Sequence, residues 1–191
     1  MSDSIITKRA IADGLKSLVP GKKSFDKVSI SDITSACGLN RQTFYYHFQD
    51  KYELLNWIYY TEGFSRILDG ITFENWPERF HQLLDIMKEN QGFYMNTIKC
   101  EESCFSDYLL EITAALFEAA LEKLDTDHHM TPEDKSFFSQ FYSYGICGVL
   151  LSWVKSGMKQ PTDRVAANLH KLAKETEQFA HLIYTNQDLL S

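Results

Sequence analysis

Seven side chains that form hydrogen bonds gather within eleven consecutive positions, and these are Arg41, Gln42, Thr43, Tyr45, Tyr46, His47 and Lys51. Arg and Gln pair with the edges of purine bases, whereas Thr, Tyr and His donate hydrogen bonds to phosphate oxygens. Lys51 follows a helix-start signal, where its charge and the free backbone N–H groups would both suit a phosphate. Any single tyrosine can instead be a half-buried packing ring. As a set, the residue types indicate a nucleic-acid interface.

Short helices are predicted to present these side chains. Ser29 with Asp32 three residues later is typical of a capping box, and Gly38 suits the left-handed residue that ends a helix. Asn40 is a good N-cap for the next helix, which we expect over residues 40–48. Two short helices joined by a tight Gly-containing turn are typical of a helix-turn-helix, whose second helix enters the major groove.

Two further patterns support the helix expected over residues 40–48, which we call the reading helix because it would contact the bases. Phe44 and Phe48 lie four residues apart and can be buried together, which leaves the polar residues on the other faces. Asp50 and Glu53 form another cap pair and open a longer helix. With an apolar first helix before residue 20, the pattern predicts a three-helix head.

Charge is distributed unevenly along the 191 residues. Residues 1–49 contain seven Lys and Arg and four Asp, which gives a net charge of +3. Because the whole chain has a net charge of −7, the remaining residues have a net charge of −10. A basic head on an acidic body directs one end toward phosphates. We therefore expect a DNA-binding domain at residues 1–49 and a C-terminal domain at residues 50–191.

Composition favours an all-α chain, because only four prolines and nine glycines interrupt it. No run of apolar residues is long enough to cross a membrane, and the first residues lack a signal peptide's apolar core, so we expect a cytoplasmic protein. No catalytic or metal-binding motif is present. We therefore expect no enzyme activity, catalytic residue, metal or cofactor. The four cysteines are expected to be reduced thiols. Cys100 and Cys104 lie four residues apart and can share a helix face as a redox or metal pair, but we interpret this spacing as helix packing.

The run from Ser29 to Leu54, SISDITSACGLNRQTFYYHFQDKYEL, resembles the DNA-binding signature of TetR/AcrR transcriptional regulators. The matching positions are Asp32, Ile33, Ala36, Gly38, Thr43, Tyr45, His47, Phe48, Lys51, Glu53 and Leu54. The resemblance implies that Thr43, Tyr45, His47 and Lys51 touch the DNA backbone, and that Arg41 and Gln42 read bases. It also implies a homodimer on a palindromic operator. Gln42 stands where the family commonly has Gly, so no operator sequence is implied.

The last two long helices have surplus apolar surface. Thr131-Pro132 starts one helix that is apolar nearly all round, and Thr162-Asp163 starts another. We expect them to form a four-helix dimer interface, although these faces can also be the core of one monomer. The predicted interface residues are Gly145, Gly148, Leu151, Leu169, Leu172 and Phe179.

The stretch from Phe141 to Leu172 resembles the C-terminal domain of DhaS-type regulators, through W-x-x-x-G followed by Pro and a terminal helix. That resemblance implies control by a partner protein, whereas many TetR relatives bind a small-molecule effector. Aromatic residues that can line an effector pocket, or be plain core, are Trp76, Phe80, Phe93, Tyr94, Phe105, Tyr108, Tyr142 and Trp153. The alternatives are a DhaS-like co-activator acting mainly through a partner protein and a helical interaction protein without specific DNA binding.

Overall fold

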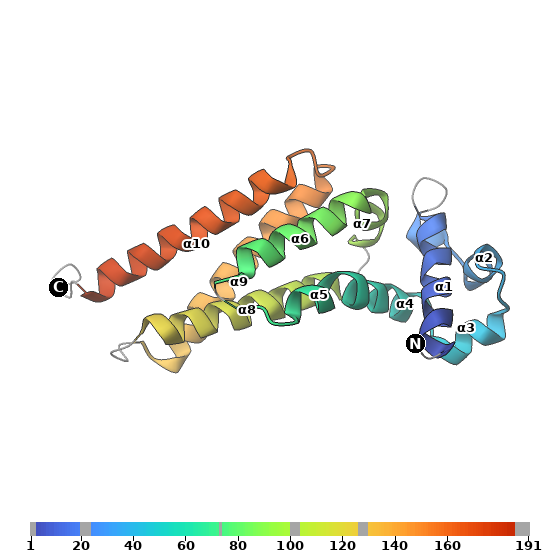
Figure 1. Ribbon diagram of the computed structural model, residues 1–191, viewed down its shortest axis with the longest axis horizontal. Coiled ribbons are helices and arrows are strands. Elements are labelled where there is room, and N and C mark those ends of the chain that lie inside the picture. Colours follow the sequence, from blue (N-terminus) through green and yellow to red (C-terminus); the bar gives the residue numbers. More distant parts are fainter. Residues whose placement is uncertain (1–2, 20–23, 73, 100–103, 126–129, 186–191) are drawn as a thin grey trace. The chain divides into compact units, whose positions relative to one another are not determined.

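The computed structural model describes residues 3–19, 24–72, 74–99, 104–125 and 130–185, without the side chains of 3, 66, 68, 124 and 176–185. Within these ranges every regular element is a helix (Figure 1), which confirms the all-α prediction. The chain divides into two compact units, residues 1–66 with 89–105 and residues 67–88 with 106–191.

The first unit begins with the three-helix head. Its elements are α1 (Asp3–Leu18), the 3₁₀ turn η1 (Phe25–Lys27), α2 (Ile30–Ala36) and α3 (Arg41–His47), followed by α4 (Lys51–Ile58). α1 buries Ile11, Ala12 and Leu15 completely, because these residues face the other helices of the head. The predicted head is therefore present.

The first unit extends beyond residue 49. It includes α4, the π-helical turn η2 (Tyr59–Phe64), the start of α5 (Ser65–Leu68) and the later helix α7 (Gln91–Thr97). A compact packing unit and a functional domain are different divisions, so the functional boundary after residue 49 stays a prediction.

The π-helical turn explains how two rings in η2 reach the same neighbour. Tyr59 and Phe64 are five residues apart, and their ring centroids lie 5.3 Å and 5.2 Å from that of Phe105. An α-helix turns about 100° per residue and would place residues five apart on different sides. The wider π turn brings them to one side. The Tyr59 hydroxyl also donates to Thr97 Oγ1 at 2.7 Å in α7.

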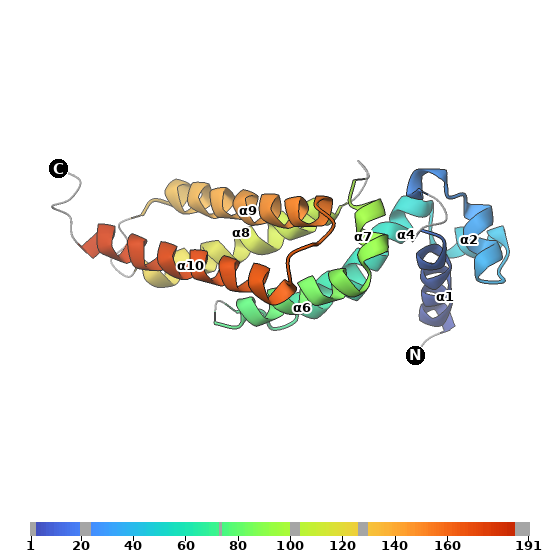
Figure 2. The same ribbon diagram turned by 90° about the horizontal axis from the view of Figure 1, so that it is seen from above.

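The helices of the second unit are α6 (Trp76–Glu89), α8 (Phe105–Leu124), α9 (Pro132–Lys155) and α10 (Thr162–Thr185). Figure 2 shows α8, α9 and α10 running lengthwise beside one another. This is the predicted C-terminal helical bundle.

The α9–α10 corner explains the W-x-x-x-G pattern. Gly157 and Met158 have φ angles of 84° and 49°, so the chain reverses through two left-handed residues. The Trp153 carbonyl accepts from the Met158 backbone N–H, and the Trp153 indole donates to the Gln160 carbonyl at 3.0 Å. Lys88 Nζ of α6 donates to the Met158 carbonyl at 2.7 Å. The tryptophan therefore fixes where α10 starts.

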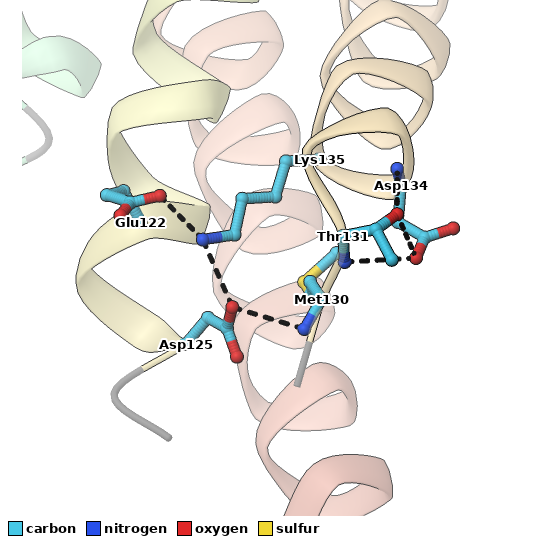
Figure 3. A network of polar contacts seen from close by, with 6 residues as sticks. All are labelled: Glu122, Asp125, Met130, Thr131, Asp134 and Lys135. Carbon is cyan, nitrogen blue, oxygen red and sulfur yellow. Dashed lines mark hydrogen bonds and ion pairs between the residues drawn. The ribbon is translucent and has the colours of Figure 1, made fainter. Parts of the chain in front are cut away.

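A polar network closes the α8–α9 connection (Figure 3). Lys135 Nζ lies 2.6 Å from Glu122 Oε2 and 3.1 Å from Asp125 Oδ2, and Asp125 also accepts from the Met130 backbone N–H. Thr131 and Asp134 cap α9 reciprocally, as the Thr-Pro signal predicts. Lys135 and Asp125 are both buried, so each needs the other's charge.

Candidate nucleic-acid interface

The turn between α2 and α3 has the geometry of a helix-turn-helix. Ser29 and Asp32 form the predicted capping box of α2. Gly38 has a φ of 69°, and the N–H of Leu39 donates to the Thr34 carbonyl at 2.9 Å, a Schellman termination. α2 therefore stops abruptly, and only four residues separate it from the start of α3.

Capping and burial hold α3 in place. The Asn40 Oδ1 atom accepts from the Thr43 backbone N–H at 2.8 Å and from the Thr43 hydroxyl at 3.1 Å. Phe44 and Phe48 are 0% and 2% exposed, and their rings lie 5.9 Å apart. The predicted N-cap and buried face are thus both confirmed, and α3 presents its remaining faces outward.

The outward faces carry the predicted recognition residues. Arg41, Gln42, Tyr45 and Tyr46 are exposed, whereas Thr43 and His47 are half-buried. Tyr46 is 84% exposed and lies opposite the buried phenylalanines around the helix, so it is central to the outward face. The sequence pattern alone did not distinguish Tyr46 from a packing ring.

Contacts within α3 orient several of these groups. The Arg41 guanidinium donates to the Tyr45 hydroxyl at 3.5 Å and lies 6.0 Å from the Tyr45 ring centroid. The Tyr46 and His47 rings form an edge contact at 5.0 Å. A ready-formed set of donors and rings thus faces outward from one short helix.

The Lys51 side chain is engaged within the head. Its ammonium donates to the carbonyls of Phe25, Asp26 and Val28 at 3.1, 2.9 and 3.2 Å. The prediction that this ammonium binds phosphate therefore competes with three existing hydrogen bonds. Its backbone position is as expected, at the start of α4, where Asp50 Oδ1 accepts from the N–H groups of Tyr52 and Glu53.

The aromatic residues predicted for an effector pocket belong to both packing units. Trp76 and Phe80 belong to the second unit, whereas Phe93, Tyr94 and Phe105 pack with Tyr59 in the first. Burial raises the pKa of Tyr94. Apolar periodicity could not separate these groups, because it shows that a ring is buried without showing against what.

The other three predicted pocket residues have different surroundings. Tyr142 stacks on Phe117 at 5.0 Å, Trp153 belongs to the α9–α10 corner, and Tyr108 is half-buried in α8. Trp76 and Phe80 do line a small apolar cavity together with Thr113, Leu116, Phe117 and Ile146. Its volume of about 10 Å³ is that of a single water molecule.

The predicted dimer residues divide into exposed and buried groups. Gly145, Gly148 and Leu172 are exposed and Leu151 is half-buried, but Leu169 is 4% exposed and lies in the chain's own core. Leu169 is buried because its stripe on α10 packs inward. Phe179 lies outside the residues whose side chains are described.

Five exposed apolar side chains on α9 are not among the dimer residues predicted from the sequence. They are Phe137, Phe138, Phe141, Tyr144 and Val149, with exposures of 67%, 37%, 62%, 65% and 46%. Phe137, Phe141, Tyr144 and Gly148 follow one another at spacings of four, three and four residues, a pattern that indicates one side of α9, and Val149 lies at the edge of that side. A groove of about 520 Å³ borders this side and is lined by Tyr144, Gly145, Gly148, Val149, Ser152, Trp153, Ser156, Gln160 and Val165.

Among the described residues, no group of three or more His, Cys, Asp or Glu is placed to hold a metal. Cys37, Cys104 and Cys147 are free thiols, and burial raises the pKa of Cys147. Cys100 lies outside the described residues. None of the described helices is long and apolar enough to cross a membrane.

A head with two short helices, a glycine turn and an outward, donor-rich second helix defines a helix-turn-helix DNA-binding protein. The chain matches the family model described as "Bacterial regulatory proteins, tetR family" over residues 21–58, and "Transcriptional regulator C-terminal region" over residues 74–175. The chain therefore belongs to the TetR family of transcriptional regulators and is a DNA-binding regulator.

Two comparisons with DhaS proteins match this chain over most of its length. The HTH-type dhaKLM operon transcriptional activator DhaS of Lactococcus lactis subsp. lactis (strain IL1403) is 29% identical over 150 residues, 78% of this chain and 80% of that protein. The solved structure of "Dihydroxyacetone kinase operon activator DhaS" is 25% identical, with a TM-score of 0.73, covering 92% of this chain and 98% of its own.

Another solved structure supports the fold alone. Native NalD, described as the secondary repressor of the MexAB-OprM multidrug efflux pump in Pseudomonas aeruginosa, is 19% identical with a TM-score of 0.57. That match covers 89% of this chain and 94% of NalD.

Proposed function

We propose that this TetR-family regulator is a homodimer that binds a palindromic operator by inserting α3 into the major groove. The observation that carries the proposal is the outward face of α3, where Arg41, Gln42, Tyr45 and Tyr46 are exposed over a fully anchored Phe44. Arg41 and Gln42 read base edges, and Thr43, Tyr45 and His47 bind the DNA backbone.

The small number of base contacts that one short helix can make favours two copies of the protein on the operator. One seven-residue helix contacts few bases, whereas a two-fold dimer reads two half-sites and gains from both. The exposed side of α9, with Phe137, Phe141 and Tyr144, offers apolar surface for a second copy. A Cβ added to Gly145 or Gly148 would meet no atom within 4 Å, so another helix can approach closely there.

The signal that controls binding is proposed to be a partner protein. The cavity beside Trp76 and Phe80, of about 10 Å³, is far smaller than the roughly 300 Å³ or more of an ordinary ligand pocket. The groove of about 520 Å³ borders the side of α9 that we propose a second copy covers. The alternative is a small-molecule effector whose binding opens the bundle. The DhaS relatives carry the word activator in their names, so we propose activation as the outcome and a reporter assay as its test.

Selection of genomic DNA fragments by the purified protein tests the proposal. We expect one enriched palindromic sequence, bound by two copies per duplex. Recovery of no common site would contradict a specific regulator and favour a helical interaction protein.

The same selection separates the two modes of control. A cell extract is divided by mass into small molecules and macromolecules, and each fraction is added to the protein–operator complex. A change caused by the macromolecular fraction supports partner control, whereas a change caused by the small-molecule fraction supports an effector. We also propose a cytoplasmic location, because a regulator that binds genomic DNA in a bacterium acts in the cytoplasm. The proposed role requires no catalysis.

A further inference from the structure

We propose that Lys51 is a positioning residue that holds the reading helix in place, rather than a ligand of DNA phosphate. The proposal rests on the proposed function, because what Lys51 positions is the helix that reads the operator. It reverses the role that the sequence resemblance implies for this lysine.

The first observation is that the Lys51 ammonium has a full set of partners. An ammonium has three N–H donors and no acceptor, and Lys51 Nζ lies 2.9 to 3.2 Å from three backbone carbonyl oxygens. Binding a phosphate would require the side chain to leave these carbonyls. If Lys51 contacted phosphate, the head would therefore lose these three hydrogen bonds, which we call the Lys51 tie.

The second observation is that aromatic rings surround the same ammonium. Nζ lies 4.8 Å from the Phe25 ring centroid and 5.4 Å from that of Tyr52, and the two rings contact each other edge to face at 5.6 Å. Phe25 is 1% exposed, so its side of the arrangement is core. Cation–π attraction and the carbonyl bonds thus hold the ammonium at one place.

The location of these carbonyls links Lys51 to the reading helix. Phe25, Asp26 and Val28 belong to or directly follow η1, and the next residue is Ser29, the N-cap of α2. Lys51 itself begins α4, four residues after α3 ends. One side chain therefore ties the segment that precedes the helix-turn-helix to the segment that follows it.

The geometry also explains why the residue is lysine. A compact ammonium on a flexible stem can direct three donors to three carbonyls that converge on one point. A guanidinium is larger and planar and presents its donors as a fork, which suits phosphate better than this arrangement. Lys51→Arg therefore separates the two roles, because arginine keeps the charge and loses the fit.

The experiment uses the full-length protein with Lys51→Met, Lys51→Arg and the control Lys27→Met. Lys27 is exposed in the same turn, so its substitution removes the same charge without removing the tie. Affinity is measured against salt concentration for the selected operator and for a duplex of unrelated sequence. Amide hydrogen exchange is followed in α2 and, for comparison, in α9.

We expect both Lys51 variants to lose about tenfold or more in operator affinity, with the salt slope and the affinity for the unrelated duplex unchanged. The ratio between the two affinities separates a positioning role from the alternatives, since loss of a phosphate contact or of folded protein lowers both affinities equally. Exchange should accelerate in α2 and not in α9. Lys27→Met should keep the wild-type ratio.

The proposal is overturned if Lys51→Met lowers the salt slope by about one and Lys51→Arg restores binding, because that is the behaviour of a phosphate ligand. It is also overturned if exchange in α2 matches the wild type. Failure of the wild-type protein to bind either duplex would defeat the proposed function instead, and the exchange comparison would still test the tie.

Discussion

Individual side chains on α3 have separable roles. Phe44 and Phe48 are buried and anchor the helix, and Asn40 caps it. The exposed side chains do not pack in the core. Tyr46 is the clearest case, because its side chain is 84% exposed and lies opposite the anchors. A substitution on this face should therefore change DNA binding and leave the fold intact.

Tyr46→Ala should lower operator affinity by about tenfold, which corresponds to about 1.4 kcal/mol. The free energy of unfolding should change by less than about 0.5 kcal/mol, because the ring is exposed. Fluorescence anisotropy and urea unfolding measure the two quantities. Tyr60→Ala is the control, since Tyr60 is an exposed tyrosine of the same unit outside α3. Wild-type affinity in Tyr46→Ala would remove Tyr46 from the interface.

Gln42→Ala should change which base is preferred at one position of each half-site. A bidentate contact discriminates by about 1–3 kcal/mol, and its loss relaxes specificity without removing a phosphate contact. Repeating the fragment selection with the variant, together with salt titrations, tests this. An unchanged sequence preference would show that Gln42 does not read bases.

At the scale of elements, the ends of the helices were the most predictable features. Ser29, Asn40, Asp50 and Thr131 all cap helices as their sequence patterns predict, because capping depends on neighbours within four residues. The π-helical turn could not be predicted from its own residues, because the ring that both Tyr59 and Phe64 contact is Phe105, far along the chain. The scattered pocket aromatics and the Lys51 contacts likewise depend on residues far along the chain.

Gly38→Ala should destabilise the protein by about 1 kcal/mol. Its φ of 69° is costly for a residue with a Cβ, although the Cβ would meet nothing within 4 Å, so the cost is backbone strain alone. Gly38→Asn should recover part of the loss, since Asn tolerates this conformation. Urea unfolding compares the three proteins, and equal stability of the Ala variant would contradict the strain.

The Lys135 network should give an alkaline limit to stability. Hydrogen bonds to Glu122 and Asp125 raise the pKa of Lys135 above its ordinary value of 10.5. A raised pKa means that the contribution is fully present below pH 10.5 and is lost as the pH rises through the folded-state value. Thermal unfolding of wild type and Lys135→Met should therefore differ by a constant amount at neutral pH, with a difference that shrinks above pH 10.5. A constant difference at all pH values would contradict the ion pairs.

At the scale of the whole molecule, the exposed side of α9 predicts how the oligomer can be broken. Phe141→Glu places a charge on a surface proposed to be dry in the dimer, while Phe141 is 62% exposed in one chain. We expect a folded monomer by light scattering and circular dichroism, with operator affinity reduced to that of a half-site. Phe141→Leu should stay dimeric. A dimeric Glu variant would place the interface elsewhere.

The π-helical turn also gives this gene one place where its length can change by one codon. Removing one codon between Tyr59 and Phe64 would leave the two residues four apart, and an ordinary α-helix brings residues four apart to one side. Both rings would then still face Phe105. The same deletion in an ordinary α-helical turn would rotate every later residue of that helix by about 100°. A relative that lacks one residue here is therefore expected to keep both rings, whereas a one-residue loss elsewhere in the helix should be selected against.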